Sequence, residues 1–293
     1  MKQFLSVLIP TYNRAQMTLE AVASVGNNPE VEIVVMDDHS GDEEYDKLMD
    51  GLDNIETECT INSFCQDINQ GMTKNFNECM KVASGEWFGL IGSDDYYKPG
   101  AIDRVVQALH HLPPCLMVYA RSNNARILPP GTDTVRSLQL PSGSGNFWHR
   151  SIYEDLGGFD ERLTFSPDAE YWYRIAAKYP VAESPEKFSV YREHGNNLMY
   201  DTWRQQDEFI RQIKLITRLN MVHRGEDIDD LDLIVANERK AEWDTTMYIL
   251  KTTSTKPDKF DIFDMYIQMA SSMAFTVDRL DAIKHFLNVR NKK

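Results

Sequence analysis

The sequence predicts an α/β fold, with a mostly parallel central sheet flanked by helices. Through the first half of the chain, short apolar runs typical of buried strands alternate with segments whose apolar residues recur at helical spacing. Such alternation is typical of successive strand–helix units, whose strands lie parallel in one sheet. From about residue 201 the strand patterns stop and only helical spacing remains. We therefore expect a sheet-containing domain at 1–200 and a C-terminal helical appendage at 201–293.

The expected elements follow in chain order. Short apolar runs predict strands at residues 5–9, 31–36, 57–61, 87–91 and 116–120, of which 57–61 has the weakest pattern. Apolar residues at i, i+3 and i+4 predict helices at residues 15–25, 72–83, 102–112 and 172–179. The acidic stretch 37–53 is expected to form a loop and a short helix, and the Pro-, Gly-, Ser- and Asn-rich stretch 121–147 a loop with an edge strand. A short strand at 187–192 precedes three helices at 203–221, 231–251 and 260–289.

Composition places the chain among globular proteins and narrows its partners. It is 42% hydrophobic and 26% charged, and its net charge of −14 argues against nucleic acid as the main partner. No apolar stretch approaches the roughly 18–20 residues of a membrane span, which leaves only peripheral contact with a membrane. The N-terminal run is typical of a strand rather than a signal peptide, and the four cysteines lack metal-ligand spacing. We therefore expect a cytoplasmic protein with free thiols.

Two adjacent carboxylates, Asp94 and Asp95, are the most informative feature of the chain. They directly follow the predicted strand at 87–91 and precede Pro99 and the predicted helix at 102–112. Ligands of open α/β sheets bind at the carboxyl ends of the strands. Two close carboxylates repel each other, and hard oxygen ligands suit Mg²⁺ or Mn²⁺, which could carry a substrate diphosphate. Asp is also common in solvated turns, so this pair alone leaves both interpretations open.

Three further polar segments are expected at the same edge of the sheet. Residues 9–14 and 35–41 leave the ends of the first two strands, and residues 69–75 enter a helix through a Gly-containing turn. A helix N-terminus suits a phosphate, a carboxylate can accept from a base or from ribose hydroxyls, and Tyr12 can stack on a base. Each segment alone is also explained by a turn or a helix cap. Together with Asp94 and Asp95 they predict a nucleotide site.

The sequence resembles the family-2 glycosyltransferases, which have the GT-A fold. The resemblance spans roughly residues 4–198, in family order, and rests on the segments "VLIPTYNR", "VVMDDHSGD", "NQGMTKNFNECMKVASGEWFGLIGSDDYYKPGAI", "FWHRSIYEDLGGFDERL", "PDAEYWYR" and "YREHGNN". It implies a nucleotide-sugar half at about 1–100 and an acceptor half at about 101–200. It also implies a nucleotide-sugar donor and a divalent metal, Mn²⁺ or Mg²⁺.

The resemblance also assigns roles to individual residues. It implies nucleotide binding by Pro10, Tyr12, Arg14, Asp38, Asn69, Lys74, Asn75 and Asp94, with Asp38 on the base. Ser93-Asp94-Asp95 occupies the D-x-D position with Ser in first place, so that Asp95 would hold the metal, together with His194. Asp168 occupies the position of the catalytic base, although Pro167 precedes it where many members have Glu. Glu170 is the alternative base, and Trp148, Glu170 and Trp172 are assigned to the acceptor, while Trp148 fits a place in the core equally well.

The implied reaction is a single displacement that inverts the anomeric configuration. The metal and the helix N-terminus would stabilise the charge on the nucleoside diphosphate as it leaves. Asp168 would take the proton of the acceptor hydroxyl as that oxygen attacks the anomeric carbon. A UDP-sugar is the expected donor, and a polysaccharide or a lipid-linked glycan the expected acceptor.

Four alternatives stay open at this point. A nucleotidyltransferase on a similar sheet would need a Gly-rich loop near the N-terminus, and residues 10–14 contain no glycine. An inactive relative that only binds a sugar nucleotide would not need Asp168. Transfer to a protein or to a modified DNA base would use the same donor site, and the acidic balance argues against DNA. No pattern in the sequence indicates an oligomeric state.

Overall fold

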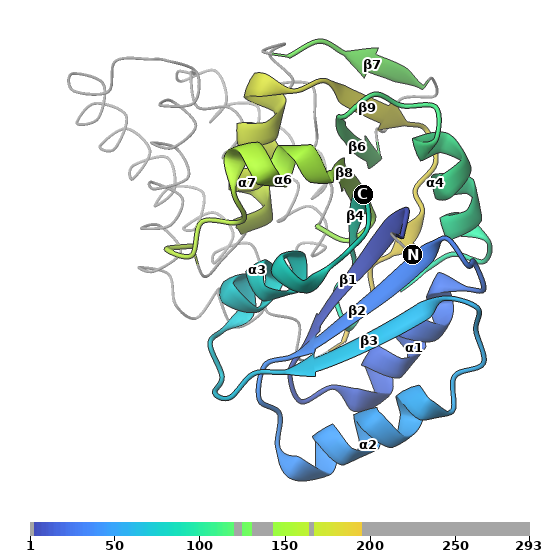
Figure 1. Cartoon of the computed structure of the whole chain (residues 1–293), viewed down its shortest axis with the longest axis vertical. Helices are drawn as coiled ribbons and strands as arrows, with labels where there is room; N and C mark the ends of the chain where they lie inside the picture. The colour runs from blue at the N-terminus through green and yellow to red at the C-terminus, as the bar shows by residue number, and fades with distance from the viewer. Residues whose placement is uncertain (1–2, 120–124, 131–142, 164–166, 195–293) are drawn as a thin grey trace, which may run out of the picture. The chain divides into compact units, whose positions relative to one another are not determined.

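The computed structural model describes residues 3–119, 125–130, 143–163 and 167–194. All of them belong to one compact unit, formed by residues 1–134 and 140–197 (Figure 1). The predicted helical appendage at 201–293, and its boundary near residue 200, lie outside the described residues. None of the helices within the described ranges combines the length and apolar character that crossing a bilayer requires.

The central sheet has eight strands in the order β3-β2-β1-β4-β8-β6-β9-β7 (Figure 1). Their bounds are Leu5–Thr11 for β1, Val31–Asp37 for β2, Thr60–Cys65 for β3, Trp87–Leu90 for β4, Leu116–Tyr119 for β6, Arg126–Leu128 for β7, Asn146–His149 for β8 and Val181–Ser184 for β9. Strands β1 to β4 are parallel to one another, and β6 is parallel to β9. Only β8 and β7 run against their neighbours. The predicted mostly parallel sheet is confirmed.

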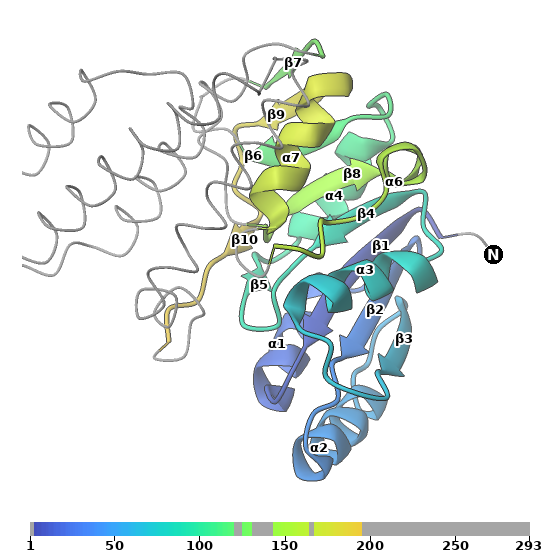
Figure 2. The same ribbon diagram turned by 90° about the vertical axis from the view of Figure 1, so that its left-hand side faces the viewer.

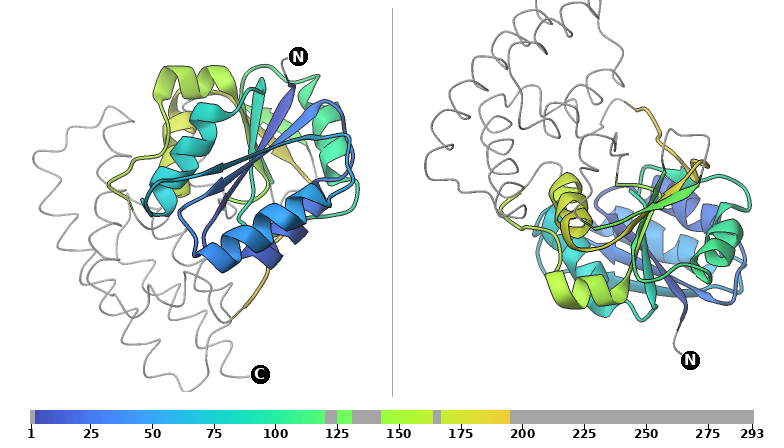
Figure 3. Two further views of the ribbon diagram at one scale, coloured as in Figure 1. Left: turned by 60° about the horizontal axis from the view of Figure 1, so that its bottom comes forward. Right: turned by 90° about the horizontal axis from the view of Figure 1, so that it is seen from above.

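Helices cover both faces of this sheet. They are α1 at Ala15–Val25, α2 at Asp42–Asp53, α3 at Met72–Val82, α4 at Ala101–Leu109, α6 at Arg150–Leu156 and α7 at Pro167–Lys178. One face carries α3, α6 and α7, and the other carries α1, α2 and α4 (Figures 2 and 3). A separate two-stranded sheet pairs β5, Tyr96–Tyr97, with β10, Ser189–Val190.

The two faces of the sheet bury two different cores. All seven residues of β1 are buried, because helices cover the strand on both sides. On one side Leu5, Val7 and Ile9 pack in a mainly aliphatic core with residues of α1, α2 and α4. On the other side Trp148 lies among aromatic rings, with its ring centroid 5.6 Å from that of Phe88. Burying each such side chain contributes about 1.5–3 kcal/mol, so both cores hold the sheet in place.

Several predicted elements need correction. The third strand lies at Thr60–Cys65 rather than 57–61, because its position is set by pairing with β2 and not by its own exposed pattern. The acidic stretch forms a full helix, α2, rather than a short one. Strands β8 and β9 and helix α6 were not predicted, and only the centre of the expected 187–192 strand forms, as β10. The edge strand expected within 121–147 is confirmed as β7 at the end of the sheet.

Candidate functional site

The loops that follow β1 and β2 are tied to each other at one edge of the sheet. The backbone N–H of Asn13 donates to the Ser40 hydroxyl at 2.7 Å, and the Asn13 side-chain oxygen accepts from Gly41 N–H at 2.9 Å. Asn13 holds this position with a positive φ of 50°, a conformation that Asn tolerates better than most residues. Glu44 of α2 accepts from the first backbone N–H of α1, at Ala15, over 2.8 Å. The two loops therefore form one braced surface, as expected for segments at the same edge.

Pro10 and Tyr12 differ in what they present to that surface. Pro10 is buried in β1, where it lies opposite Met36 of β2. Pairing between β1 and β4 ends at Leu8, so the N–H that proline lacks is not needed for a hydrogen bond to β4. Tyr12 is 47% exposed, on the loop just past the strand. Of the two, only Tyr12 offers a ring face that a base could stack on.

Asp38 joins the end of β2 to the turn that starts α3. Its carboxylate is 3% exposed, and its two oxygens accept from the backbone N–H groups of Gln70 and Gly71, each at 2.8 Å. Gly71 has a φ of 87°, which favours glycine at this turn. The carboxylate thus holds the turn that carries Asn69, and its predicted role on the base stays a prediction.

The first turn of α3 brings two of the predicted phosphate ligands to the same place. Lys74 is exposed, whereas Asn75 is 2% exposed and donates to the Met36 carbonyl at 2.8 Å. The side-chain oxygen of Asn75 has no hydrogen-bond partner among the described residues. Because α3 begins at Met72, both residues lie at a helix N-terminus, whose free N–H groups attract anions.

Asp94 receives two nitrogen groups from distant parts of the chain. The Arg14 guanidinium donates to its Oδ2 at 2.7 Å, and His194 Nε2 lies 3.0 Å from the same oxygen. Residues 14, 94 and 194 come from the loop after β1, the turn after β4 and the segment after β10. The structure therefore brings together three of the residues that the sequence placed in the nucleotide and metal sites.

Asp95 is a buried carboxylate held by a different set of donors. It is 3% exposed, its Oδ1 accepts from the backbone N–H of Arg192 at 3.0 Å, and its Oδ2 accepts from the Ser144 hydroxyl. Burial raises the pKa of Asp95 to about 6, because a charged carboxylate loses its hydration there, and the neighbouring Asp94 adds to the rise. A nearby cation would offset both effects.

The two carboxylates converge at Gly92. A methyl group in place of the Gly92 hydrogen would lie 2.8 Å from Asp94 Oδ1 and 3.6 Å from Asp95 Oδ2. Within the described ranges no three His, Cys, Asp or Glu residues are grouped so as to hold a metal ion by themselves. Mg²⁺ in proteins, however, is commonly held by one or two carboxylates together with substrate phosphates. The pair of carboxylates fits a cation of that kind, with His194 beside Asp94.

Asp168 lies against the same short loop as Asp95. It is half-buried in the first turn of α7. A methyl group at Gly143 would lie 3.0 Å from Asp168 Oδ2, and the next residue, Ser144, donates to Asp95. The predicted base and the predicted metal ligand therefore contact adjacent residues of one loop, Asp168 at Gly143 and Asp95 at Ser144.

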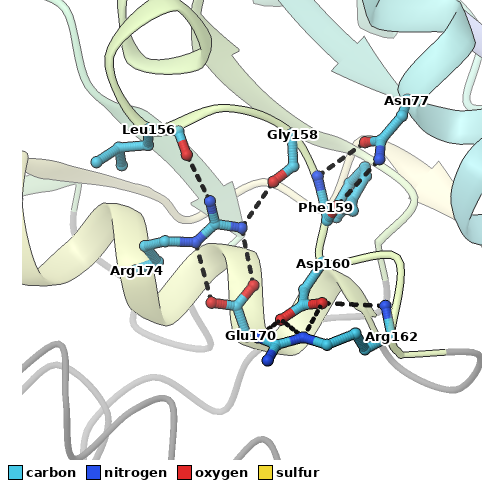
Figure 4. A network of polar contacts seen from close by, with 8 residues as sticks. All are labelled: Asn77, Leu156, Gly158, Phe159, Asp160, Arg162, Glu170 and Arg174. Carbon is cyan, nitrogen blue, oxygen red and sulfur yellow. Dashed lines mark hydrogen bonds and ion pairs between the residues drawn. The ribbon is translucent and has the colours of Figure 1, made fainter.

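Glu170 is placed quite differently from Asp168, although both are on α7. Its carboxylate is 1% exposed and accepts two hydrogen bonds from Arg174, both at 2.9 Å (Figure 4). The same guanidinium donates to the carbonyls of Leu156 and Gly158 at 2.6 and 2.7 Å. This arrangement fixes the turn at 156–158 to α7, and it accounts for a buried carboxylate without any contact to a substrate.

The residue that directly follows this turn, Phe159, is bonded to α3. Asn77 is 7% exposed, donates to the Phe159 carbonyl at 3.0 Å and accepts from Phe159 N–H at 2.8 Å (Figure 4). Gly158 leaves room for this clamp, because a methyl group there would lie 2.3 Å from Asn77 Oδ1. Helix α3, which carries the predicted phosphate site, and helix α7, which carries the predicted base, therefore both bond to the segment 156–159.

Trp148 and Trp172 are both fully buried, 5.2 Å apart by ring centroid. They form part of the aromatic core, where neither ring offers a face to an acceptor in this conformation. Of the two interpretations of Trp148, burial favours the core. The acceptor roles of Trp148, Glu170 and Trp172 stay predictions.

Sequence reasoning did not single out three residues that the structure places at or beside the site. Ser144 lies in a Gly- and Ser-rich stretch that predicts only a loop, and Arg192 contacts Asp95 through its backbone, which no side-chain pattern reveals. Asn77 follows the predicted ligands on α3 by two positions. The signal available for Asn77 was a polar residue among the apolar positions 76, 79 and 80 of the predicted helix, since a polar side chain on such a face needs hydrogen-bond partners.

Several relatives of this chain are described as glycosyltransferases. A curated glycosyltransferase of Rickettsia conorii, described as uncharacterized, is 26% identical over 204 residues, which are 60% of this chain and 32% of that protein. The Campylobacter jejuni GalNAc(5)-diNAcBac-PP-undecaprenol beta-1,3-glucosyltransferase is 31% identical over 106 residues, 35% of this chain and 33% of that protein. The chain thus spans about a third of the length of these two relatives.

Solved structures share the fold. The S. aureus TarS fragment 1–349 in complex with UDP-GlcNAc has a TM-score of 0.61 at 17% identity, covering 96% of this chain and 84% of that one. The Pyrobaculum calidifontis mannosyltransferase PcManGT, in complex with GDP-Man and Mn²⁺, has a TM-score of 0.59 at 14% identity, covering 93% and 87%. The predicted GT-A fold is therefore confirmed for the sheet-containing part of the chain.

The pattern of glycosyl transferase family 2 matches residues 6–157, which is more than half of the 293 residues and covers strands β1 to β8 apart from the first residue of β1. The chain belongs to glycosyl transferase family 2.

Proposed function

We propose that this protein transfers a sugar from a nucleoside-diphosphate sugar to an acceptor hydroxyl, with inversion at the anomeric carbon. The observation that carries the proposal is the loop at 143–145, which has Asp95 bonded to Ser144 and Asp168 packed against Gly143. A group that stabilises the departing diphosphate and a group that deprotonates the acceptor must lie close together for a single displacement. The loop provides that proximity.

The donor half of the site is assigned to the braced edge of the sheet. Tyr12 stacks on the base, and Asp38 and the turn at 69–71 lie beside it. The N-terminus of α3, with Lys74 and Asn75, faces the diphosphate, since its free N–H groups favour negative charge. Asp95, Asp94 and His194 are assigned to a divalent cation, Mn²⁺ or Mg²⁺. When bound, that cation neutralises charge on the leaving diphosphate.

Asp168 is the proposed general base, in preference to Glu170. A base must reach the proton that it removes, and Asp168 is half-buried at the start of α7. Glu170 is 1% exposed and uses both oxygens on Arg174, so it would have to break a buried ion pair to act. The carboxylate of Asp168 would accept the acceptor proton as the new glycosidic bond forms and the bond to the diphosphate breaks.

The proposed donor is a UDP-sugar, and the proposed acceptor is a glycan or a lipid-linked glycan. TarS binds UDP-GlcNAc, whereas PcManGT binds GDP-Man, so the fold accepts either nucleotide. The glycan in the name of the Campylobacter relative is carried on undecaprenol, which supports a lipid-linked acceptor.

Two measurements test the proposal. Titration calorimetry with UDP, GDP and dTDP, each with and without Mn²⁺, should show metal-dependent binding of one diphosphate. Release of that nucleoside diphosphate from its sugar donor should then be lost in Asp168→Asn while nucleotide affinity is kept. Binding without any turnover by the wild type would instead support an inactive sugar-nucleotide-binding relative.

A further inference from the structure

The segment at 191–194 carries His194 to Asp94, yet it has neither helix nor strand to hold it. Just before it, β10 pairs with β5, so that Val190 lies opposite Tyr96. Tyr96 directly follows Asp95 in the chain. Pairing therefore fixes where the segment starts, and some other contact must fix where it ends.

Arg192 supplies that contact from its side chain. Its Nη1 donates to Glu20 Oε2 of α1 at 2.5 Å, and its guanidinium carbon lies 5.4 Å from the centroid of the Tyr96 ring. At that distance a guanidinium and an aromatic face attract each other. The backbone N–H of the same residue donates to Asp95 Oδ1 at 3.0 Å. Arg192 therefore contacts α1 and β5 through its side chain and the carboxylate of Asp95 through its backbone.

Chain geometry couples the position of His194 to this anchor. His194 lies two residues after Arg192, and its Nε2 reaches Asp94 Oδ2, the oxygen that Arg14 also contacts. A backbone that moves away at position 192 would release the hydrogen bond to Asp95 and draw His194 away from Asp94. Both carboxylates of the convergent pair are therefore coupled to the ion pair between Arg192 and Glu20 of α1.

We propose that Arg192 is a positioning residue: by anchoring its segment to Glu20 and Tyr96, it holds His194, Asp94 and Asp95 in the arrangement that receives a nucleotide-bound divalent cation. This inference rests on the proposed function, since it concerns the same site. Arg192 itself contacts neither the cation nor the sugar in this scheme. Its effect passes through the backbone of 191–194.

The Arg192–Glu20 pair is suited to a clean test because it contributes little to global stability. The Glu20 side chain is 47% exposed, and ion pairs at a protein surface stabilise folding only weakly. Loss of the pair should therefore change the site more than it changes Tm. A matched control exists on the other side of β10, where Arg104 of α4 pairs with the exposed Glu186. Both pairs join a helix to a residue that flanks the same short strand.

The experiment compares Arg192→Met, Arg192→Lys, Glu20→Gln and Arg104→Met by titration calorimetry with UDP and GDP, each with and without Mn²⁺. Arg192→Met should weaken binding in Mn²⁺ by about 10-fold or more, as is usual when a partner that orients metal ligands is removed. Metal-free affinity and Tm should not change. Arg192→Lys keeps a cation over Tyr96 and should recover most of the lost affinity. Glu20→Gln should lose less affinity than Arg192→Met. Arg104→Met should bind the nucleotide as the wild type does.

Three results would overturn the inference, and they differ in what else they affect. Wild-type affinity in Arg192→Met would overturn the positioning role alone. Equal losses in Arg192→Met and Arg104→Met would show a general effect on β10 and overturn it as well. A wild type without any metal-dependent nucleotide binding would overturn the proposed function together with the inference, before any variant is compared.

Discussion

Replacing Arg174 with Met should destabilise the protein strongly, because it removes the partner of a buried carboxylate. Arg174 gives two hydrogen bonds to Glu170, which is 1% exposed, and one each to the carbonyls of Leu156 and Gly158. Removing one member of a buried ion pair costs about 3–5 kcal/mol. Full burial of a carbonyl that has lost its donor costs about 1–3 kcal/mol, and these two half-buried carbonyls lie toward the lower end of that range. Since these losses overlap, we expect a decrease of about 4–6 kcal/mol in the free energy of unfolding.

The double variant Glu170→Met with Arg174→Met gives the reasoning its sharpest test. Among the described residues, removing the carboxylate together with its partner leaves the two carbonyls without their donor. The double variant should therefore be more stable than Arg174→Met alone, by about 2 kcal/mol. Equilibrium urea unfolding at pH 7, followed by tryptophan fluorescence, measures both, since Trp148 and Trp172 are fully buried beside this cluster.

Asp168→Asn on the same helix is the matched control, and it should change stability by no more than about 1 kcal/mol. The reasoning is refuted if Arg174→Met costs less than about 1 kcal/mol, or if the double variant is no more stable than the single one. Either result would mean that Glu170 does not depend on Arg174, and Glu170 would then regain its standing as a candidate base.

Three further predictions concern single residues. Gly145→Ala should lower Tm and weaken Mn²⁺-dependent nucleotide binding, measured by thermal unfolding and calorimetry, because Gly145 has a φ of 88° and a methyl group there would lie 2.5 Å from Ser189 Oγ. Asp38→Asn should reduce nucleotide affinity by about 10-fold or more, because the new amide nitrogen would face a backbone N–H of the 70–71 turn. Unchanged affinity would show that the turn needs no carboxylate. The Arg162 guanidinium lowers the pKa of Asp160, so this carboxylate stabilises the fold above the ordinary Asp pKa, and the stability is lost as pH falls through the lowered value. The difference in Tm between wild type and Asp160→Asn should accordingly be present at pH 7 and shrink on acidification.

Elements whose signals are local were predicted well from the sequence. Helix α1 has the predicted bounds, and β1 and β2 extend the predicted runs by one or two residues. Because both faces of these two strands are buried, they are nearly continuous apolar runs that can be recognised as strands from the sequence alone. The location of Asp94, Asp95 and the loops after β1 and β2 at one edge follows from the same strand assignments, because parallel strands end together.

Elements and contacts that depend on distant residues were not predicted. Strand β8 has four residues, and it is a strand only because β4 and β6 pair with it on either side. Strand β9 carries two apolar residues, Val181 and Ala182, too few for a periodic pattern. Likewise, Asp95 receives its donors from residues 144 and 192, at separations of 49 and 97 positions, which no local motif encodes.

The place of β8 in the sheet has a consequence for how the chain assembles during synthesis. Strands β1 to β4 are joined by successive strand–helix units, so this half can form as soon as residue 90 has emerged. Strand β6 is made next, yet it pairs with β8 and β9 and not with β4. Until residue 149 emerges, β4 therefore has one unpaired apolar edge, at Trp87–Leu90, and β6 has no partner. Such edges are templates for pairing with other chains, so the interval between residues 90 and 149 is the stage at which the nascent protein is most exposed to aggregation.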